Sequence, residues 1–175
     1  PEHEGPGVSD AVFMSSRDGV SWDRPFLEAW VRPGPDLKNW TDRNNMTANG
    51  IITGDTEWSL YISEHYRHAD HRIRRLSVRK QGFASMHADA KGGEFTTHPL
   101  KFTGKNLVLN YSTSAAGSLQ IDALDDAGKV LAIIPELYGD DLEASVLDVS
   151  KLAGQTIRLR VKMKDADLFA LRFAK

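Results

Sequence analysis

Apolar and polar residues alternate with a period of two along most of the chain, which is the pattern of half-buried β-strands. In the run 57–63, Trp58, Leu60 and Ile62 fall on one face, and the run 71–79 can pair with it across the loop 64–70. The same alternation predicts further strands at 82–88, 93–102, 106–112, 117–124, 129–134, 156–164 and 167–173. Strands repeating every ~8–12 residues, with Gly, Asp or Asn at the breaks, predict an all-β sandwich or barrel.

Helical patterns are confined to single turns at 25–30 and at 148–154, the second ended by Gly154. The composition changes near residue 90, because all four Trp residues precede it and the region after it consists of regular strands. We therefore predict two units joined at 88–93. Residues 1–88 form an irregular, aromatic β region, and residues 93–175 form a compact antiparallel sandwich.

A polar turn with Asp18-Gly19 at its tip interrupts the apolar pattern at 15–24. An Asp side chain at such a position accepts hydrogen bonds from the amides of its own turn. We expect Trp22 to pack beneath this turn. The hairpin then serves as a structural staple, or alternatively as a ligand contact.

Two loops carry candidate ligand-binding residues. The first contains Trp40, Arg43 and Asn44; a Trp face stacks on a sugar ring, while Arg and Asn hydrogen-bond its hydroxyl groups. Function tends to lie on such irregular loops. The alternative is a surface loop held in place by a buried Trp40.

The second loop, 64–71, contains Glu64, His65 and Tyr66, which could line a cleft. Three of the six histidines lie in it, so a zinc site is conceivable, but their spacing suits neither a helical metal motif nor a zinc finger. The remaining alternative is that these are ordinary surface side chains of a hairpin loop with no role in binding.

Charge and composition exclude several classes of function. Lys and Arg number 22 against 24 Asp and Glu, so nothing favours nucleic acid or an anionic membrane as a partner. The absence of Cys excludes disulfides, thiolate metal sites and Cys nucleophiles. No apolar run approaches the ~20 residues of a membrane helix. The chain begins with Pro1, so we expect upstream sequence to be missing.

No cofactor and no metal site are predicted. Besides the zinc site considered above, calcium is an alternative, with carboxylates that could act as ligands at Asp122, Asp125 and Asp126 or at Asp165 and Asp167. The run 125–128 is more simply a hairpin turn.

The runs EWSLYISEHYRH, RIRRLSVRKQGFASMHA, GGEFTTHPLKFTGKNLVLNYSTSAAGSLQIDALDDAGKVL and IRLRVKMKDADLFALRF together resemble a group of bacterial proteins. That group is related to glycoside hydrolase family 32, with sialidase-like features, and carries a five-bladed β-propeller followed by a β-sandwich. The resemblance covers residues 10–174 and is strongest at 82–85, 96–110, 116–118 and 164–168.

The resemblance implies that residues 1–88 correspond to the last part of a propeller and 93–175 to the jelly-roll-like accessory sandwich. The family's catalytic motifs, Trp-Met-Asn-Asp-Pro-Asn-Gly, Arg-Asp-Pro and Glu-Cys, do not occur in the chain. Arg17-Asp18-Gly19 lacks the Pro of the second motif. No catalytic residue is therefore assigned.

The leading hypothesis is a non-catalytic, carbohydrate-associated module of a secreted or periplasmic glycoside hydrolase. Its partners would be an oligo- or polysaccharide and the missing propeller portion. The first alternative is a glycoside hydrolase or lyase whose cleft is formed by the 40–66 loops, with Glu64 as the acid. The second is a purely structural sandwich. A flat row of exposed Trp or Tyr side chains would favour binding, whereas burial of all four Trp side chains would favour a scaffold.

Overall fold

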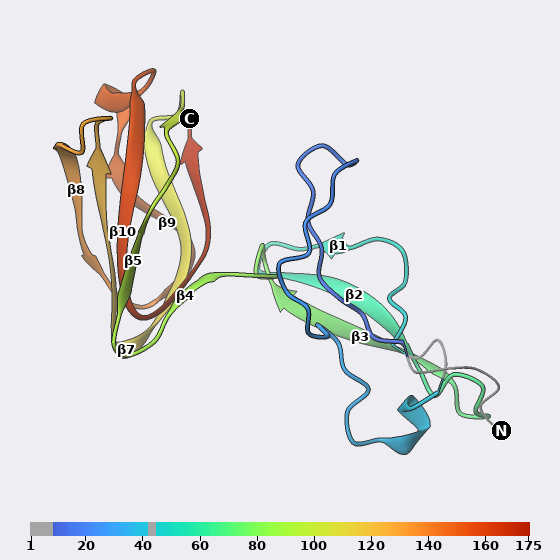
Figure 1. Cartoon of the computed structure of the whole chain (residues 1–175). Coiled ribbons are helices and arrows are strands. Elements are labelled where there is room, and N and C mark those ends of the chain that lie inside the picture. Colours follow the sequence, from blue (N-terminus) through green and yellow to red (C-terminus); the bar gives the residue numbers. More distant parts are fainter. Residues whose placement is uncertain (1–8, 42–44) are drawn as a thin grey trace. The chain divides into compact units, whose positions relative to one another are not determined.

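The computed structural model describes residues 9–41 and 45–175. In this range the chain is all-β, with one antiparallel sheet of three strands, one of seven, and two single 3-10 turns, which confirms the predicted fold class. Two compact units divide between Lys80 and Gln81, and Figure 1 shows one sheet in each. The prediction placed the joint at 88–93. No helix in the described residues is long and apolar enough to cross a membrane.

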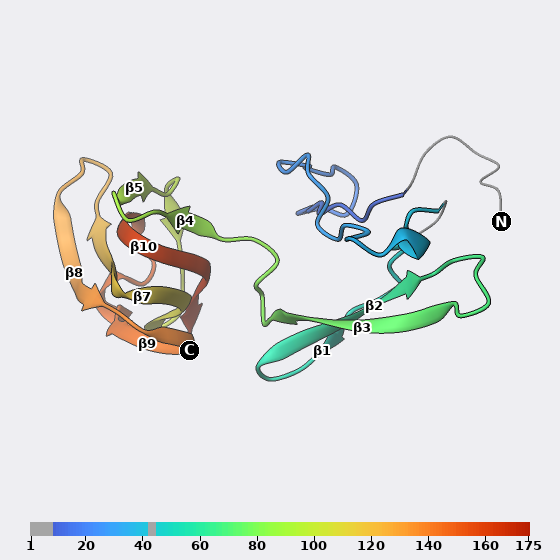
Figure 2. The same cartoon turned by 90° about the horizontal axis from the view of Figure 1, so that it is seen from below.

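The first unit is a thin sheet with irregular chain along it. Its strands β1 (Ile52–Thr53), β2 (Glu57–Glu64) and β3 (Arg72–Arg79) pair in the order β1-β2-β3. The β2–β3 register, with Leu60 opposite Leu76, confirms the predicted hairpin. The irregular N-terminal segment, which includes the turn η1 (Leu37–Asn39), lies along one side of the sheet (Figure 2).

The second unit contains the remaining strands and the second turn. They are β4 (Met86–Ala88), β5 (Gly93–Thr96), β6 (Leu100–Lys101), β7 (Asn106–Leu124), β8 (Val130–Leu137), β9 (Asp140–Asp148), η2 (Ser150–Leu152) and β10 (Thr156–Ala174). Strands β7 and β10 have 19 residues each and pair with each other along nearly their whole length.

The two long strands generate two layers because each half has different outer neighbours. The C-terminal half of β7 and the N-terminal half of β10 lie between β8 and β5/β6. The other two halves lie between β9 and β4. Bending β7 and β10 at the same end brings these two ribbons face to face (Figure 1), as in a sandwich.

The bend has a local cause at Gly117 and Asp165. Asp165 has a φ of +42°, and the β7–β10 register shifts between Lys164 and Ala166. A Cβ at position 117 would collide with the Asp165 carbonyl oxygen, so this crossing requires glycine. The shift also changes which residues of β10 face inward, from odd-numbered positions to Ala166 and Leu168.

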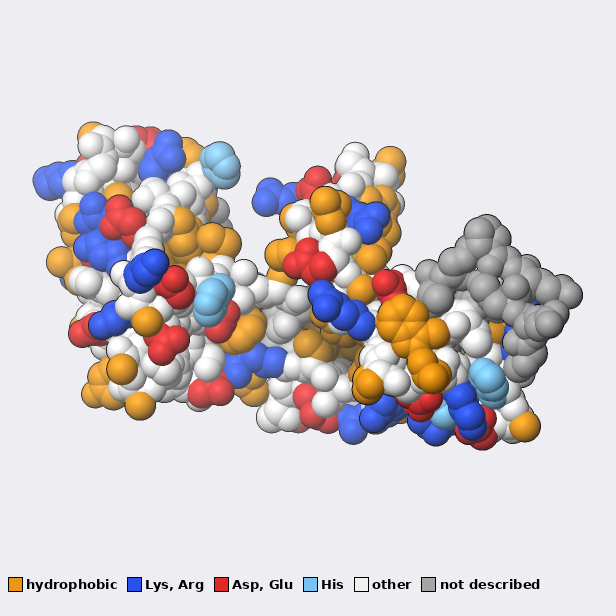
Figure 3. Space-filling model, turned by 60° about the horizontal axis from the view of Figure 1, so that its bottom comes forward, with side chains coloured by type: hydrophobic (Ala, Val, Ile, Leu, Met, Phe, Trp, Pro, Cys, Tyr) orange, Lys and Arg blue, Asp and Glu red, His pale blue; other side chains and the backbone are white. Residues whose placement is uncertain are grey.

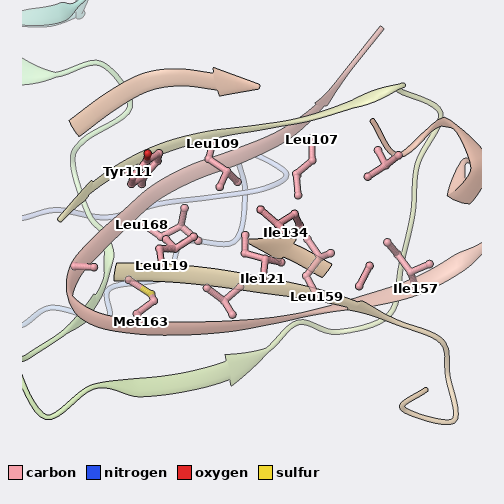
Figure 4. Close-up of a cluster of buried hydrophobic side chains, with 14 of the residues drawn as sticks. Leu107, Leu109, Tyr111, Leu119, Ile121, Ile134, Ile157, Leu159, Met163 and Leu168 are labelled. Atoms are coloured by element: carbon pink, nitrogen blue, oxygen red, sulfur yellow. The ribbon is translucent and has the colours of Figure 1, made fainter. Parts of the chain in front are cut away.

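A continuous apolar core fills the space between the two layers (Figure 4). Leu107, Leu109, Leu119, Ile121, Ile134, Ile157 and Val161 are each fully buried in it. Phe102 and Phe173 stack with ring centroids 3.8 Å apart. At roughly 25 cal/mol per Å² of apolar surface, burial of this kind supplies most of the stability of such a unit.

Several strand predictions were wrong in their limits. Two predicted pairs, 106–112 with 117–124 and 156–164 with 167–173, are continuous strands. Residues 82–85 and 25–30 have no regular structure, whereas η2 lies inside the predicted turn at 148–154. Strand β9 was missed because Asp, Glu, Ala and Ser are poor strand formers, although Leu142, Ala144 and Val146 do alternate with polar residues.

Candidate functional site

A hollow of about 380 Å³ lies in the first unit, between the irregular segment 31–39 and the inner face of β2 and β3. This volume is within the range of small-molecule pockets. Apolar residues line part of it: Val31, Pro33, Pro35, Ile62 and Leu76. Polar residues line the rest: Arg32, Asp36, Asn39, Asn45, Glu64, Arg72 and Arg74.

Glu64 lies at the end of β2 with its side chain only 3% exposed. Its two carboxylate oxygens accept hydrogen bonds from Arg72 Nε at 2.8 Å and Arg74 Nη1 at 2.7 Å, both on β3. Burial opposes ionisation of Glu64, but the two guanidinium groups outweigh it and lower the pKa of Glu64. A general acid requires a raised pKa, so this geometry does not suit the role of acid considered for Glu64.

His65 joins three segments of the first unit and is buried, with a φ of +54°. Its Nδ1 lies 2.9 Å from Asp70 Oδ2, and its Nε2 lies 2.9 Å from Asp36 Oδ2. A neutral imidazole carries a single N–H, so both contacts are hydrogen bonds when both ring nitrogens are protonated. The His65 backbone N–H donates to Asn39 Oδ1 at 3.0 Å, which fixes η1 against the β2–β3 loop.

The two carboxylates around His65 are stabilised in their charged forms. The hydrogen bond with His65, followed by that from the Lys38 amide, lowers the pKa of Asp36. The hydrogen bond from Lys38 Nζ, at 2.7 Å, is the main cause that lowers the pKa of Asp70. These contacts therefore hold the segment around Asp36 and Lys38, which borders the hollow, against the β2–β3 loop.

Trp40 lies beside the hollow and is 52% exposed. Its indole Nε1 donates to the Gly34 carbonyl at 2.9 Å, and Gly34 itself lines the hollow. Trp22 is also exposed, at 58%, while Trp30 and Trp58 are half-buried. Trp40 therefore does not pin its loop into a core; its ring faces solvent in a fixed orientation.

The other predicted site residues are not among the described residues that line the hollow. Tyr66 does not line the hollow; its ring packs edge-on against His71, with centroids 6.0 Å apart, and Arg67 lies over it. Arg43 and Asn44 lie outside the described residues. Sequence reasoning missed Asp36, Asn39, Arg72 and Arg74, whereas Asn45 ends the loop 40–45 that was a candidate. For the arginines, the alternation along β3 was a usable signal, since Arg72 pairs opposite Glu64 and Arg74 opposite Ile62.

The 15–24 turn is only partly as predicted. Asp18 Oδ1 accepts from the amides of Val20 at 2.8 Å and Ser21 at 2.7 Å, which confirms the capped turn. These hydrogen bonds lower the pKa of Asp18 to about 2. The packing of Trp22 beneath the turn was wrong, since that side chain is largely exposed.

The second unit offers less for a ligand. A hollow around Asn110 and Arg172 measures about 30 Å³, room for about one water. Asp122, considered for calcium, is buried and bonded to Arg160 at 2.5 Å, with Lys162 at 3.2 Å, and Asp125 caps its own hairpin turn. The described residues contain no group of three His, Asp or Glu placed to hold a metal ion. On the face shown in Figure 3, acidic and basic side chains are intermixed.

No protein-family model, curated protein or solved structure matches the chain. The resemblance to glycoside hydrolase family 32-like proteins therefore stays a prediction, and the candidate site stands on its geometry.

Proposed function

We propose that the chain is a carbohydrate-associated module and that its first unit binds a saccharide at the hollow beside Trp40. The observation that carries the proposal is the exposed Trp40 indole, oriented by its hydrogen bond to Gly34 at the edge of a polar hollow. An aromatic face with nearby hydrogen-bonding groups matches the two sides of a sugar ring, whose C–H face is apolar and whose hydroxyl groups are polar.

Exposure of Trp22 and Trp40 favours binding over the purely structural alternative. The contacts of Glu64 with two arginines favour binding over catalysis at this site. In this proposal the module belongs to a secreted or periplasmic glycoside hydrolase, and the catalytic carboxylates are supplied by a propeller portion outside the chain.

A glycan array that includes neutral and acidic polysaccharides, followed by affinity-gel electrophoresis, tests the proposal. We expect retardation by at least one polysaccharide, lost in Trp40→Ala and largely retained in Trp40→Phe, which keeps an aromatic face. Trp22→Ala is the matched control, an exposed Trp that, unlike Trp40, has no hydrogen bond to a described residue of the hollow. Retardation by no glycan, or equal losses in Trp40→Ala and Trp22→Ala, would contradict a saccharide site at this hollow.

A further inference from the structure

The side chain of Asn45 has an unmet hydrogen-bonding requirement. It is 1% exposed, and its backbone, at a φ of +56°, is held by the hydrogen bond of its N–H to the Ser63 carbonyl at 3.1 Å. Among the described residues, Asn45 Nδ2 is the buried side-chain nitrogen or oxygen that has no hydrogen-bond partner. A buried, unpaired amide donor is costly, and a ligand that brings an acceptor removes the cost.

Asn45 lines the Trp40 hollow and also a second one of about 250 Å³. The other described lining residues of the second hollow are Ser9, Asp10, Ala11, Met46 and Thr47, and none of these is a cation. The first contains the guanidinium groups of Arg32, Arg72 and Arg74. Among the described residues, an acceptor bound by Asn45 therefore finds cationic donors only in the Trp40 hollow.

Each carboxylate oxygen of the Trp40 hollow already accepts a hydrogen bond. Both Glu64 oxygens are taken by Arg72 and Arg74, and the Asp36 oxygens by His65 and the Lys38 amide. Asn39 Oδ1 is taken by the His65 amide. Arg72 gives Glu64 only its Nε–H and Arg74 only one Nη, so N–H groups of both guanidiniums stay available, together with Asn45 Nδ2.

The hollow therefore holds unused N–H groups on Asn45, Arg72 and Arg74, the last two of them cationic, and three arginines line it against two carboxylates. A hydrogen bond in which the donor or the acceptor is ionised is roughly twice as strong as one between neutral groups, and a carboxylate facing arginines has both partners charged. The geometry points to the carboxylate of an acidic, uronic acid-type saccharide as the group bound in this hollow. Its oxygens face Asn45 Nδ2 and the arginines, and its ring lies over the apolar wall. This inference rests on the proposed saccharide binding and specifies the ligand class.

Titration calorimetry of the full chain with a galacturonate trimer and with its methyl ester tests the inference, because the ester removes only the negative charges. A glucuronate trimer and its ester form a second pair. We expect at least one free acid to bind ~10-fold or more tightly than its ester. Asn45→Asp keeps the side-chain shape and tolerates the positive φ, but it replaces the donor by a negative acceptor. We expect it to weaken binding of that acid at least ~10-fold and binding of the ester far less.

An NMR readout separates contact from folding. The Asn45 side-chain NH₂ signals, assigned by their loss in Asn45→Asp, should shift on addition of the acid. Asn45→Gly, which also suits the positive φ, should reduce affinity with an unchanged Trp fluorescence spectrum. Equal affinity for acid and ester, or no effect of Asn45→Asp, overturns the inference and leaves saccharide binding intact. Failure of all four probes overturns it as well, and the glycan array then decides separately whether the proposed function survives.

Discussion

The two units are stabilised by different means. All sixteen residues of the apolar core belong to the second unit, from Ala88 to Leu168. Among the described residues of the first unit, the buried apolar side chains are Pro33, Leu60 and Ile62, while the buried polar ones are Asn39, Asn45, Ser59, Glu64 and His65. One unit is held by an apolar interior and the other by charged and hydrogen-bonded side chains around a small sheet.

The difference explains where a ligand can bind. A close-packed sandwich leaves little unmet hydrogen bonding and little space, as the 30 Å³ hollow shows. A thin sheet covered by irregular chain must satisfy its polar groups one by one, through contacts such as those of His65 and Glu64. The group that stays unsatisfied, the Asn45 amide, marks the candidate site.

The largest expected effect comes from a cavity in the sandwich. Leu159 is 1% exposed, and Leu159→Ala should lower the free energy of unfolding by about 2–5 kcal/mol. All four Trp lie in the first unit, so Trp fluorescence reports that unit, while far-UV circular dichroism mainly reports the longer strands of the second. In urea, the dichroism midpoint should fall and the fluorescence midpoint should stay.

Leu131→Ala on β8 is the matched control, because that side chain is 37% exposed. We expect a change of ~0.5 kcal/mol or less. A parallel fall of both midpoints in Leu159→Ala would contradict the view of two separately stabilised units.

The next effect concerns the charge at Glu64. Glu64→Gln keeps the shape but weakens the hydrogen bonds from Arg72 and Arg74, which should cost about 1–3 kcal/mol in the fluorescence transition. Glu57→Gln on the same strand is the control, since Glu57 pairs with Arg75 at the surface and such pairs contribute ~1 kcal/mol or less. Equal effects of the two substitutions would show that burial of Glu64 does not matter.

The strands of the sandwich could be predicted from the sequence more fully than the candidate site could. Alternation located Leu107, Leu109, Ile121 and Leu159 because a strand buried on one face repeats every two residues. It could not show that Gly117 and Asp165 bend continuous strands, because a bend and a turn both use Gly and Asp. The contacts of His65 with Asp36 and Asp70 join positions 29 and 5 residues apart, and no local pattern encodes them.

Acid should separate the two units further. The pKa values of Asp36, Glu64 and Asp70 are lowered in the folded first unit, below unfolded values near 4. Their contribution to stability is therefore present above about pH 4 and is lost as the pH falls below it and these groups become protonated. The fluorescence midpoint in urea should fall more steeply between pH 5 and pH 3 than the dichroism midpoint.

The second unit is not insensitive to acid, because the pKa values of Asp122 and Asp148 are also lowered there. Its apolar core does not titrate, however, so its midpoint should fall less. Asp70→Asn should flatten the pH dependence of the fluorescence midpoint. Parallel curves for the two probes, or an unchanged slope in Asp70→Asn, would contradict this account.

The smallest effect is expected at the 15–24 turn, where the exposed Asp18 accepts two backbone hydrogen bonds. Asp18→Ala removes the oxygen that accepts both bonds, so the amides of Val20 and Ser21 should exchange faster with solvent, while neither unfolding midpoint changes measurably. Asp18→Asn keeps an acceptor oxygen and should preserve part of the protection. In the unaltered chain, the NMR signal of the Asp18 carboxyl should titrate with a pKa of about 2. A pKa near 4 would mean that the Asp18 carboxylate does not hold the turn. A fall of the fluorescence midpoint in Asp18→Ala would mean that this turn, like the His65 contacts, stabilises the whole first unit.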